Sequence, residues 1–314
     1  MTPPILFLTF NRPDTTARVF EAIRAARPAR LYVAADGPRP DRAGEAERCA
    51  EVRCIATAVD WPCEVKTLFR NENLGCRRAV SGAITWFFEN EPEGIILEDD
   101  CLPDPSFFTF CAEMLERYRN DPRIMCVTGN NFQTDMGDWP YSYYYSIYNH
   151  IWGWASWRRA WALYDADLER FNSSGARNLL AGLSKVPGFR RYWSSVFERV
   201  KSGNISSAWD YSWTWTCWLN SGWTCTPCVN LVSNIGFGID ATHTINEESS
   251  VANLPVVPLL PPYAAPPTIA AEPRFDDHVT REVFRGVRAY TPGRRVVKRF
   301  RHLAGRMLRS VGMR

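Results

Sequence analysis

Three adjacent carboxylates, Glu98, Asp99 and Asp100, are the residues whose types and spacing most directly suggest chemistry. They follow the apolar run Gly94 to Leu97, which is typical of a buried parallel strand, and ligands gather at the carboxyl ends of such strands. Neighbouring carboxylates repel one another, and a divalent cation with oxygen ligands would offset that cost. The motif therefore predicts Mg²⁺ or Mn²⁺ beside a phosphate. A strand that ends in a solvated acidic turn is the alternative from these residues alone.

Polar side chains also follow three earlier apolar runs, at residues 5–10, 30–35 and 65–69. Because the carboxyl ends of parallel strands share one edge of a sheet, we expect these side chains to line a single crevice that suits a nucleotide. The polar residues are Asn11 and Arg12 after the first run, Asp36 after the second, and Arg70 and Asn73 after the third.

Strand and helix patterns alternate four times over the first hundred residues, which predicts an α/β fold. Parallel neighbours need crossover connections, so we expect a mostly parallel sheet with helices on both faces. Helices are predicted over residues 41–59, 104–120, 189–201 and 211–220, and further strands over 124–128 and 141–146, the last of them half-exposed.

The second half of the chain is rich in aromatic residues, and the whole chain has 13 tryptophans. Trp152, Gly153 and Trp154 could form a wall that stacks on a sugar or base, although paired tryptophans are more often core. Asp210 follows Trp209, and an apolar setting would raise its pKa towards that of a general base. A capping aspartate at a helix start is the alternative for Asp210, and the two roles are compatible.

His243 lies just after the glycine-broken loop 234–238. A lone histidine usually satisfies a local hydrogen bond, but near a metal it can be a ligand. The pair Cys225 and Cys228 has C-x-x-C spacing without two further ligands at suitable spacing, which does not favour a zinc site.

The composition of the 314 residues, 46% hydrophobic and 23% charged, is that of an ordinary globular protein. No run of about 18 apolar residues is present, and no secretory signal pattern precedes residue 5. We therefore expect a cytoplasmic protein with reduced cysteines. The charge is uneven, because ten Lys or Arg and no acids follow Glu282, which leaves 27 basic against 34 acidic residues before that point. No nucleic-acid partner is expected.

The composition also predicts domain boundaries. Residues 1–250 form the predicted globular body, with halves at 1–130 and 131–250, and the proline-rich residues 251–280 form a predicted linker. Residues 281–314 are predicted to form a basic amphipathic helix, because apolar residues recur there at helical spacing. Such a helix could lie on an anionic membrane surface, or dock on a partner or on the acidic body.

In this order, the motifs resemble those of GT-A-type glycosyltransferases, in particular bacterial family-2-like enzymes related to N-acetylglucosaminyltransferase I. The resemblance covers roughly residues 3–250. It depends on the motifs Thr9-Phe10-Asn11-Arg12-Pro13, Asp36-Gly37, Arg70-Asn71-Glu72-Asn73-Leu74-Gly75, Glu98-Asp99-Asp100, Trp152-Gly153-Trp154, Trp209-Asp210 and Asn234-Ile235-Gly236-Phe237-Gly238.

The resemblance implies a metal-dependent enzyme with a nucleotide-diphosphate-sugar donor, UDP-sugar being the first candidate, and Mn²⁺ or Mg²⁺ as cofactor. Asp100 would bind the metal and His243 would be a looser second ligand. The motif is E-D-D rather than D-x-D, so the choice between Asp99 and Asp100 stays open. The implied donor-binding residues are Phe10, Asn11, Arg12, Asp36, Arg70, Asn73, Arg78, Glu98 and Asp99.

On the acceptor side, the resemblance implies that Asp210 is the general base of a single displacement with inversion. Trp152, Gly153 and Trp154 would shape the sugar and acceptor pocket, and Trp209 would stack on a sugar. The acceptor would be a hydroxyl of a glycan, lipid-linked or protein substrate. The basic tail would hold the enzyme on the inner membrane face.

Two other functions are weighed against this one. A sugar-nucleotide nucleotidyltransferase usually has a glycine-rich basic loop after its first strand, and residues 10–14 contain no glycine. A non-catalytic glycan-binding module would suit the aromatic surplus, but it would not need three carboxylates at a strand end or an isolated Asp210.

Overall fold

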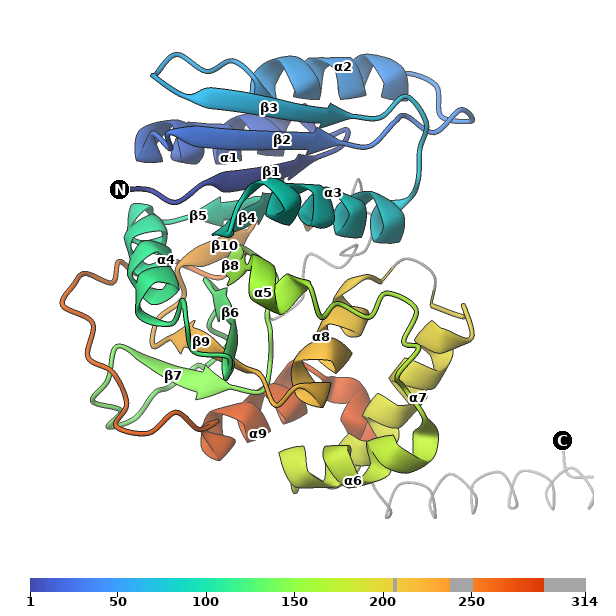
Figure 1. The fold of residues 1–314 in the computed structure, drawn as a ribbon, viewed down its shortest axis with the longest axis vertical. Helices are drawn as coiled ribbons and strands as arrows, with labels where there is room; N and C mark the ends of the chain where they lie inside the picture. The colour runs from blue at the N-terminus through green and yellow to red at the C-terminus, as the bar shows by residue number, and fades with distance from the viewer. Residues whose placement is uncertain (206–207, 238–250, 291–314) are drawn as a thin grey trace, which may run out of the picture.

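The computed structural model describes residues 1–205, 208–237 and 251–290, and most of its strands form one sheet (Figure 1). The eight strands lie in the order β3-β2-β1-β4-β8-β6-β9-β7, and a smaller sheet pairs β5 with β10. Strands β3, β2, β1 and β4 are mutually parallel, as are β6 and β9, whereas β8 and β7 are antiparallel to their neighbours. The predicted mostly parallel α/β sheet is confirmed. The strands are β1 Ile5–Thr9, β2 Arg30–Ala35, β3 Glu64–Phe69, β4 Glu93–Glu98, β5 Cys101–Pro103, β6 Ile124–Thr128, β7 Tyr143–Ser146, β8 Trp154–Trp157, β9 Trp223–Pro227 and β10 Val232–Asn234.

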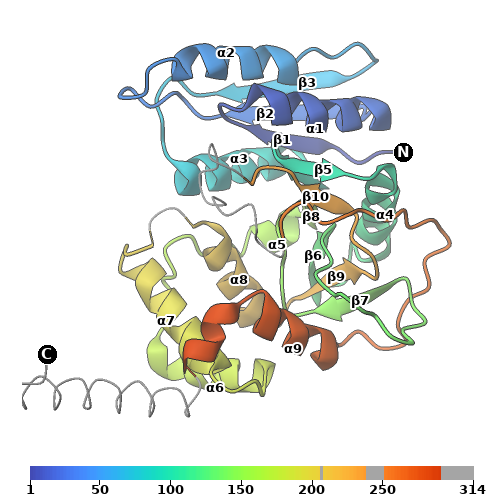
Figure 2. The ribbon, with the colours of Figure 1, turned by 180° about the vertical axis from the view of Figure 1, so that it is seen from behind.

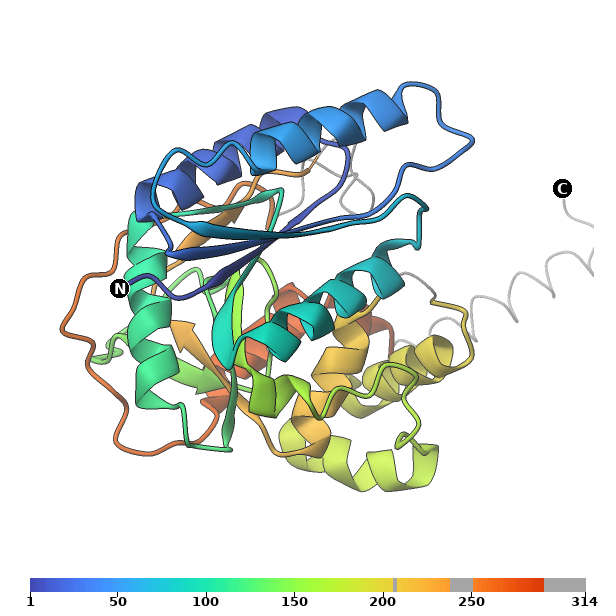
Figure 3. The ribbon, with the colours of Figure 1, turned by 45° about the horizontal axis from the view of Figure 1, so that its top comes forward.

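Helices cover both faces of this sheet, as predicted. Figure 3 shows α1 and α2 (blue) on one side of the strands β1 to β3 and α3 (teal) on the other. The helices are α1 Pro13–Ala26, α2 Glu45–Ala56, α3 Cys76–Asn90, α4 Pro105–Arg117, α5 Arg158–Trp161, α6 Ser173–Leu183, α7 Phe189–Lys201, α8 Asp210–Leu219 and α9 Pro273–Glu282, followed by the 3₁₀ helix η1 Arg285–Tyr290.

The apolar run Ile5 to Leu8 in β1 follows from burial on both faces. Side chains alternate along a strand, so Ile5 and Phe7 join the core under α1 and α4, while Leu6 and Leu8 join the core under α3, α5 and α8. A central strand between two helical layers has no solvated face and needs no polar alternation. The strand therefore ends where polarity first appears, at the edge of the sheet that carries the predicted site.

Strand β7 differs from the prediction, because it is fully buried rather than half-exposed. Tyr145 points towards α4, where its hydroxyl is 2.6 Å from that of Tyr118. Tyr144, on the other face, packs against Phe275 of α9 with ring centroids 4.5 Å apart. The hydroxyl-bearing sequence suggested a solvated face, but α9 covers that face.

The prediction that the globular body ends near residue 250 is also wrong. Tyr263, Phe275 and Val287 are buried, and Figure 2 shows the segment that leads to α9 (orange to red) crossing the body beside β7. The body therefore continues to Tyr290. Residues 291–314, which carry most of the predicted basic helix, lie outside the described residues. Within the described part of the chain, no helix is long and apolar enough to cross a membrane.

Candidate functional site

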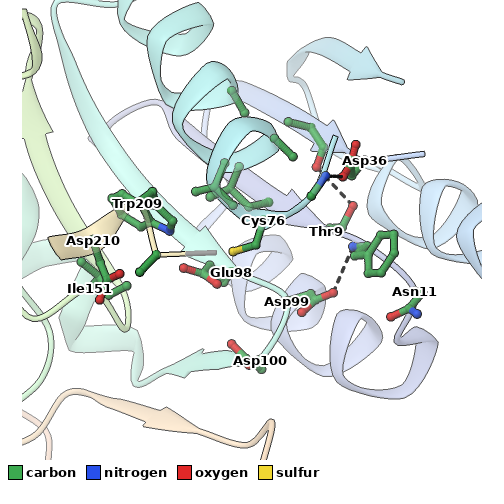
Figure 4. Close-up of a pocket in the computed structure, with 18 of the residues that line it drawn as sticks. Thr9, Asn11, Asp36, Cys76, Glu98, Asp99, Asp100, Ile151, Trp209 and Asp210 are labelled. Atoms are coloured by element: carbon green, nitrogen blue, oxygen red, sulfur yellow. Dashed lines mark hydrogen bonds between the residues drawn. The ribbon is translucent and has the colours of Figure 1, made fainter. Parts of the chain in front are cut away.

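A cavity of about 830 Å³ lies at the carboxyl ends of β1, β2 and β4, between α3 and the start of α8. That volume falls in the range of about 300–1,000 Å³ typical of ligand sites. Figure 4 shows Trp209 and Asp210 on one side of it, Asn11 and Asp36 on the other, and Glu98 to Asp100 between them. The predicted site residues that line it are Phe10, Asn11, Arg12, Asp36, Arg70, Asn73, Glu98, Asp99, Asp100, Trp152, Trp209 and Asp210.

The register of the parallel strands brings the donor-side residues together. Thr9 of β1 lies opposite Ala35 of β2, and Leu8 of β1 lies opposite Glu98 of β4. The residues that follow these strands, at positions 10, 36 and 99, therefore emerge side by side at one edge of the sheet. Sequence positions almost 90 residues apart converge because their strands end together.

Arg12 holds the acid cluster in place. Its Nη2 donates one hydrogen bond to Asp99 Oδ1 and another, of 3.0 Å, to Asp100 Oδ2. The backbone N–H of Phe10 donates to the other oxygen of Asp99 at 3.1 Å. Burial lowers the pKa of Arg12, but the charges of Asp99 and Asp100 outweigh it and raise that pKa above its ordinary value. Both oxygens of Asp99 are thus engaged, whereas Asp100 Oδ1 accepts from one group of the described residues, the thiol of Cys101 at 3.4 Å.

Glu98 is less easily ionised than Asp99. Burial, followed by the charges of Asp100 and Asp99, raises the pKa of Glu98 to about 8, and Asp210 adds to the shift across the cavity. Burial also raises the pKa of Asp99, to about 6, although Arg12 opposes that change. Among the described residues, Arg12 is the one side chain that forms ion pairs with this cluster.

Gly236 packs directly on this cluster. Strand β10 pairs with β5, and the N–H of Ile235 donates to the backbone oxygen of Asp100 at 2.8 Å. A Cβ at position 236 would lie 2.2 Å from Asp100 Oδ2 and 2.6 Å from Arg12 Nη1. Such a close approach leaves room only for glycine. Asn234 lines the cavity beside it, and its side-chain oxygen accepts from the Gly236 N–H at 2.9 Å.

Asp36 holds the loop that follows β3. Its Oδ1 accepts from the N–H of Leu74 and its Oδ2 from that of Gly75, both at 3.0 Å. Asn73 donates to the Gly37 backbone oxygen at 2.7 Å and ties the same two loops together. Asp36, one of the implied donor-binding residues, thus already positions a neighbouring loop through its carboxylate.

Asp210 is the first residue of α8, and Trp209 occupies the N-cap position without a side-chain capping bond. The helix therefore begins one residue before the predicted 211, and Asp210 lies in its first turn. Trp209 is almost fully buried and stacks on Trp154, with ring centroids 5.9 Å apart and planes 26° apart. Asp210 thus begins a helix whose entry is fixed by stacked indole rings, and it faces the cavity (Figure 4).

The structure does not bring every predicted residue to the cavity. Trp154 is fully buried between the sheet and α8, and Gly153 packs on Val232, with φ of +68°. Arg78 is exposed on α3 outside the cavity. The predicted pocket roles of Gly153 and Trp154, and the predicted donor contact of Arg78, are therefore not supported by their positions. His243 lies outside the described residues.

Other cavity-lining residues were not predicted from sequence. Arg39 pairs with the buried Glu45, and its guanidinium lies 5.5 Å from the ring centre of Phe10. The sequence signal that could have revealed Arg39 is a basic residue in the loop after β2. Arg199 of α7 also lines the cavity, and it forms no ion pair with any residue that the structure describes. Only the long-range packing of α7 reveals it.

No protein-family model matches the chain, and no curated protein matches it by sequence. Among solved structures, residues 1–349 of Staphylococcus aureus TarS match with a TM-score of 0.40 and 11% identity, covering 74% of this chain and 60% of that one. The galactosyltransferase LgtC, solved with donor and acceptor sugar analogues, matches with a TM-score of 0.36 and 12% identity, covering 81% and 84%. The glycosyltransferase GlyE of Streptococcus pneumoniae matches with a TM-score of 0.34 and 8% identity, covering 72% and 45%. These likenesses are distant, so function is inferred from the site itself.

Proposed function

We propose that the chain is a metal-dependent, inverting glycosyltransferase that uses a nucleotide-diphosphate-sugar donor, with UDP-sugar as the first candidate. The observation that carries this proposal is the composition of one cavity. It has an acidic cluster with Arg12 at one end, suited to a metal and a diphosphate, and the carboxylate of Asp210 at the other. Two chemically different ends suit a reaction that joins a charged donor to a hydroxyl acceptor.

The donor end has the chemistry of a Mg²⁺ or Mn²⁺ site, because carboxylate oxygens are preferred ligands of these cations. No three His, Cys, Asp or Glu side chains of the described residues are grouped to hold a metal by themselves. Mg²⁺ is commonly bound by one or two carboxylates together with substrate phosphates, and Asp100 fits that pattern through Oδ1. A bound cation would neutralise charge on the leaving nucleoside diphosphate.

Chain residues would complete the donor site. Arg12 keeps Asp99 and Asp100 in fixed positions, and Asp36 holds the loop that carries Arg70 and its neighbours. Asn11 donates to Glu45 at 2.8 Å, which fixes the loop after β1. The nucleoside would then lie between these two loops, at the sheet edge where nucleotides bind in α/β folds.

At the acceptor end, Asp210 would take the proton of the attacking hydroxyl. The acceptor oxygen would form a bond to the anomeric carbon as the bond from that carbon to the diphosphate oxygen breaks, which inverts the configuration in one displacement. Trp152, which contacts Phe237 edge-on at 5.7 Å, would border the sugar. A glycan, lipid-linked or protein hydroxyl would serve as acceptor. The segment 291–314 would hold the enzyme on the cytoplasmic membrane face.

The runner-up, a sugar-nucleotide nucleotidyltransferase, needs cations after β1 that are directed at a triphosphate. Here Arg12 is engaged by Asp99 and Asp100 within the protein, which favours the transferase. A purely glycan-binding module would have no use for Asp210 opposite an acidic cluster.

The test is a thermal-shift screen against nucleoside diphosphates and sugar nucleotides, with and without Mn²⁺, followed by a transfer assay with the donor that it identifies. Ligand that binds only the folded state raises its stability. Asp100→Asn should lose the Mn²⁺-dependent shift. Asp210→Asn should keep the shift but transfer roughly 10²–10⁴-fold more slowly. The exposed Asp41→Asn is the control. Wild-type turnover in Asp210→Asn would exclude it as the base.

A further inference from the structure

A second cavity, of about 580 Å³, lies between α6, α7 and η1. Its chemistry is unlike that of the main cavity, because three arginines and three serines line it together with one acid and one tyrosine. The lining residues are Ser173, Arg177, Arg190, Arg191, Ser194, Ser195, Glu198 and Tyr290.

Helical spacing explains why these side chains gather. Arg190 and Arg191 lie one turn before Ser194 and Ser195, so all four share one face of α7. Arg177 comes from α6, which packs beside α7. The α7 arginines occupy the first turn of their helix, where the helix dipole disfavours positive charge. Helix stability therefore does not explain their position.

The three arginines form no ion pair with the part of the chain that the structure describes. No carboxylate of the described residues lies within ion-pair distance of Arg177, Arg190 or Arg191. Glu198, the one acid in the cavity, accepts a hydrogen bond from the Ser173 hydroxyl at 3.0 Å. Within the described part of the chain, Arg191 donates one long hydrogen bond, of 3.4 Å, to the backbone oxygen of Tyr290. Several guanidinium groups and hydroxyls around one hollow form the donor set that a phosphate accepts from.

We propose that this cavity binds the phosphate of an anionic phospholipid headgroup. A lipid is favoured over a soluble phosphate by where the chain leaves the described residues. Tyr290 lines the cavity, and its hydroxyl is 3.2 Å from that of Ser195. The 24 residues that follow contain eight Lys or Arg and no Asp or Glu. The basic segment thus follows directly in the sequence from a residue that lines the arginine-rich cavity. Both sets of positive charge would be attracted to an anionic membrane surface.

Headgroup binding here would orient the main cavity relative to the membrane. Arg199, near the other end of α7, lines the main cavity. One helix therefore joins the headgroup site to the candidate active site. The headgroup site is independent of the reaction proposed above and can be tested without any donor or acceptor.

The full-length protein should be sedimented with phosphatidylcholine vesicles that contain phosphatidylglycerol, and with pure phosphatidylcholine vesicles. Arg190→Ala/Arg191→Ala should weaken binding to the anionic vesicles on the order of tenfold at fixed salt. The matched control, Arg18→Ala/Arg48→Ala, removes two exposed arginines from α1 and α2 and should bind like the wild type. Thermal melts should show that both variants are folded.

A lysine variant separates a built site from diffuse attraction. Arg190→Lys/Arg191→Lys keeps the charge but loses the planar fork that matches phosphate, so it should also bind less tightly. Wild-type binding by the alanine or the lysine variant would overturn the proposal. An arm with inorganic phosphate distinguishes the source of the anion. If phosphate stabilises the wild type and not the alanine variant, while vesicle binding is equal in both, the cavity takes a soluble phosphate and the lipid assignment fails.

Discussion

Arg12 donates a 3.0 Å hydrogen bond to Asp100, so the carboxylate predicted to bind a metal already has a cation beside it. The side chain of Arg12 is 22% exposed and that of Asp100 is 12% exposed, which means that water screens the pair only in part. Arg12 is the one positive residue of the described chain that forms ion pairs with the cluster of Glu98, Asp99 and Asp100. A divalent cation at this edge must therefore share the carboxylates with a guanidinium or displace it.

Arg12→Gln should lower the free energy of unfolding by about 2 kcal/mol, because it leaves buried carboxylates without their partner. Mn²⁺ should then raise the melting temperature of the variant more than that of the wild type, since the cation takes over the neutralising role. Thermal melts with and without Mn²⁺ measure both effects. Arg18→Gln, an exposed change in α1, the helix that Arg12 precedes, is the control. Equal Mn²⁺ shifts in the variant and the wild type would show that Arg12 and the metal do not meet.

Gly236→Ala should disturb the site more than the fold. The new Cβ would fall 2.2 Å from Asp100 Oδ2, so the carboxylate, the guanidinium of Arg12 or the loop must move. We expect a loss of stability of about 1–3 kcal/mol and weaker Mn²⁺-dependent binding of nucleoside diphosphate, measured by calorimetry.

The matched control for this change is Gly182→Ala in α6, where the added Cβ would have no atom within 4 Å. That variant should gain about 0.5–1 kcal/mol and bind nucleotide normally. If Gly236→Ala also bound nucleotide with wild-type affinity, Asp100 would not need its observed position.

Asp36→Asn tests whether Asp36 positions the loop after β3. An amide offers one acceptor oxygen where the carboxylate offers two. The Leu74 N–H lies within hydrogen-bond distance of both oxygens and keeps an acceptor, so the N–H of Gly75 or of Gly37 loses its partner at a cost of about 1–3 kcal/mol. Hydrogen exchange at Gly75 or Gly37 should accelerate, and nucleotide affinity should fall with it. Asp41→Asn should change neither quantity. Unchanged exchange at both glycines would mean that other contacts hold the loop.

The donor side of the site was predictable from sequence because strand ends are local signals. An apolar run that stops at a polar residue marks the edge of a parallel sheet, and that rule placed Asn11, Asp36 and Asp99 in one cavity. The rule does not apply to the motif Trp152-Gly153-Trp154, because a strand, β8, begins at its last residue. Trp152 lines the cavity and Trp154 lies in the core, because β8 begins at Trp154 and pairs with β4.

Contacts between segments far apart in the sequence account for two features that were not predicted, Arg199 in the cavity and the helix α9. Arg199 reaches the cavity only because α7 packs beside α8, and no local pattern marks it. In α9, Phe275, Asp276, Val279 and Thr280 are buried at helical spacing, but the pattern spans only ten residues after a proline-rich stretch. Composition favoured a linker there, and the covering of β7 by α9 overrode it.

Asp276 gives the α9 contact a measurable pH dependence. Its two oxygens accept hydrogen bonds from the Ser146 hydroxyl at 2.6 Å and from the Ile147 N–H at 3.2 Å. Burial raises the pKa of Asp276 from 3.8 to about 7, the two hydrogen bonds oppose that rise, and the charges of Asp277 and Glu272 add to it. The folded state therefore keeps a proton that the unfolded chain loses.

The sign of the effect follows from proton binding. Below about pH 4 both states are protonated at this residue, and above about pH 7 both are ionised. Between these values only the unfolded state is ionised, so the contribution of Asp276 to the free energy of unfolding falls as the pH rises. The full difference is at most about 4 kcal/mol, at 1.36 kcal/mol for each pKa unit.

Asp276→Asn removes the titrating group but keeps a polar side chain of the same size. Urea unfolding measured from pH 4 to pH 8 should show the stability of the wild type falling relative to that of the variant, with the change complete near pH 7. Asp277→Asn, at the next position and partly exposed, should follow the wild type. A constant difference between wild type and Asp276→Asn across this range would mean that Asp276 is ionised in the folded state. Its two hydrogen bonds would then outweigh its burial between α9 and β7.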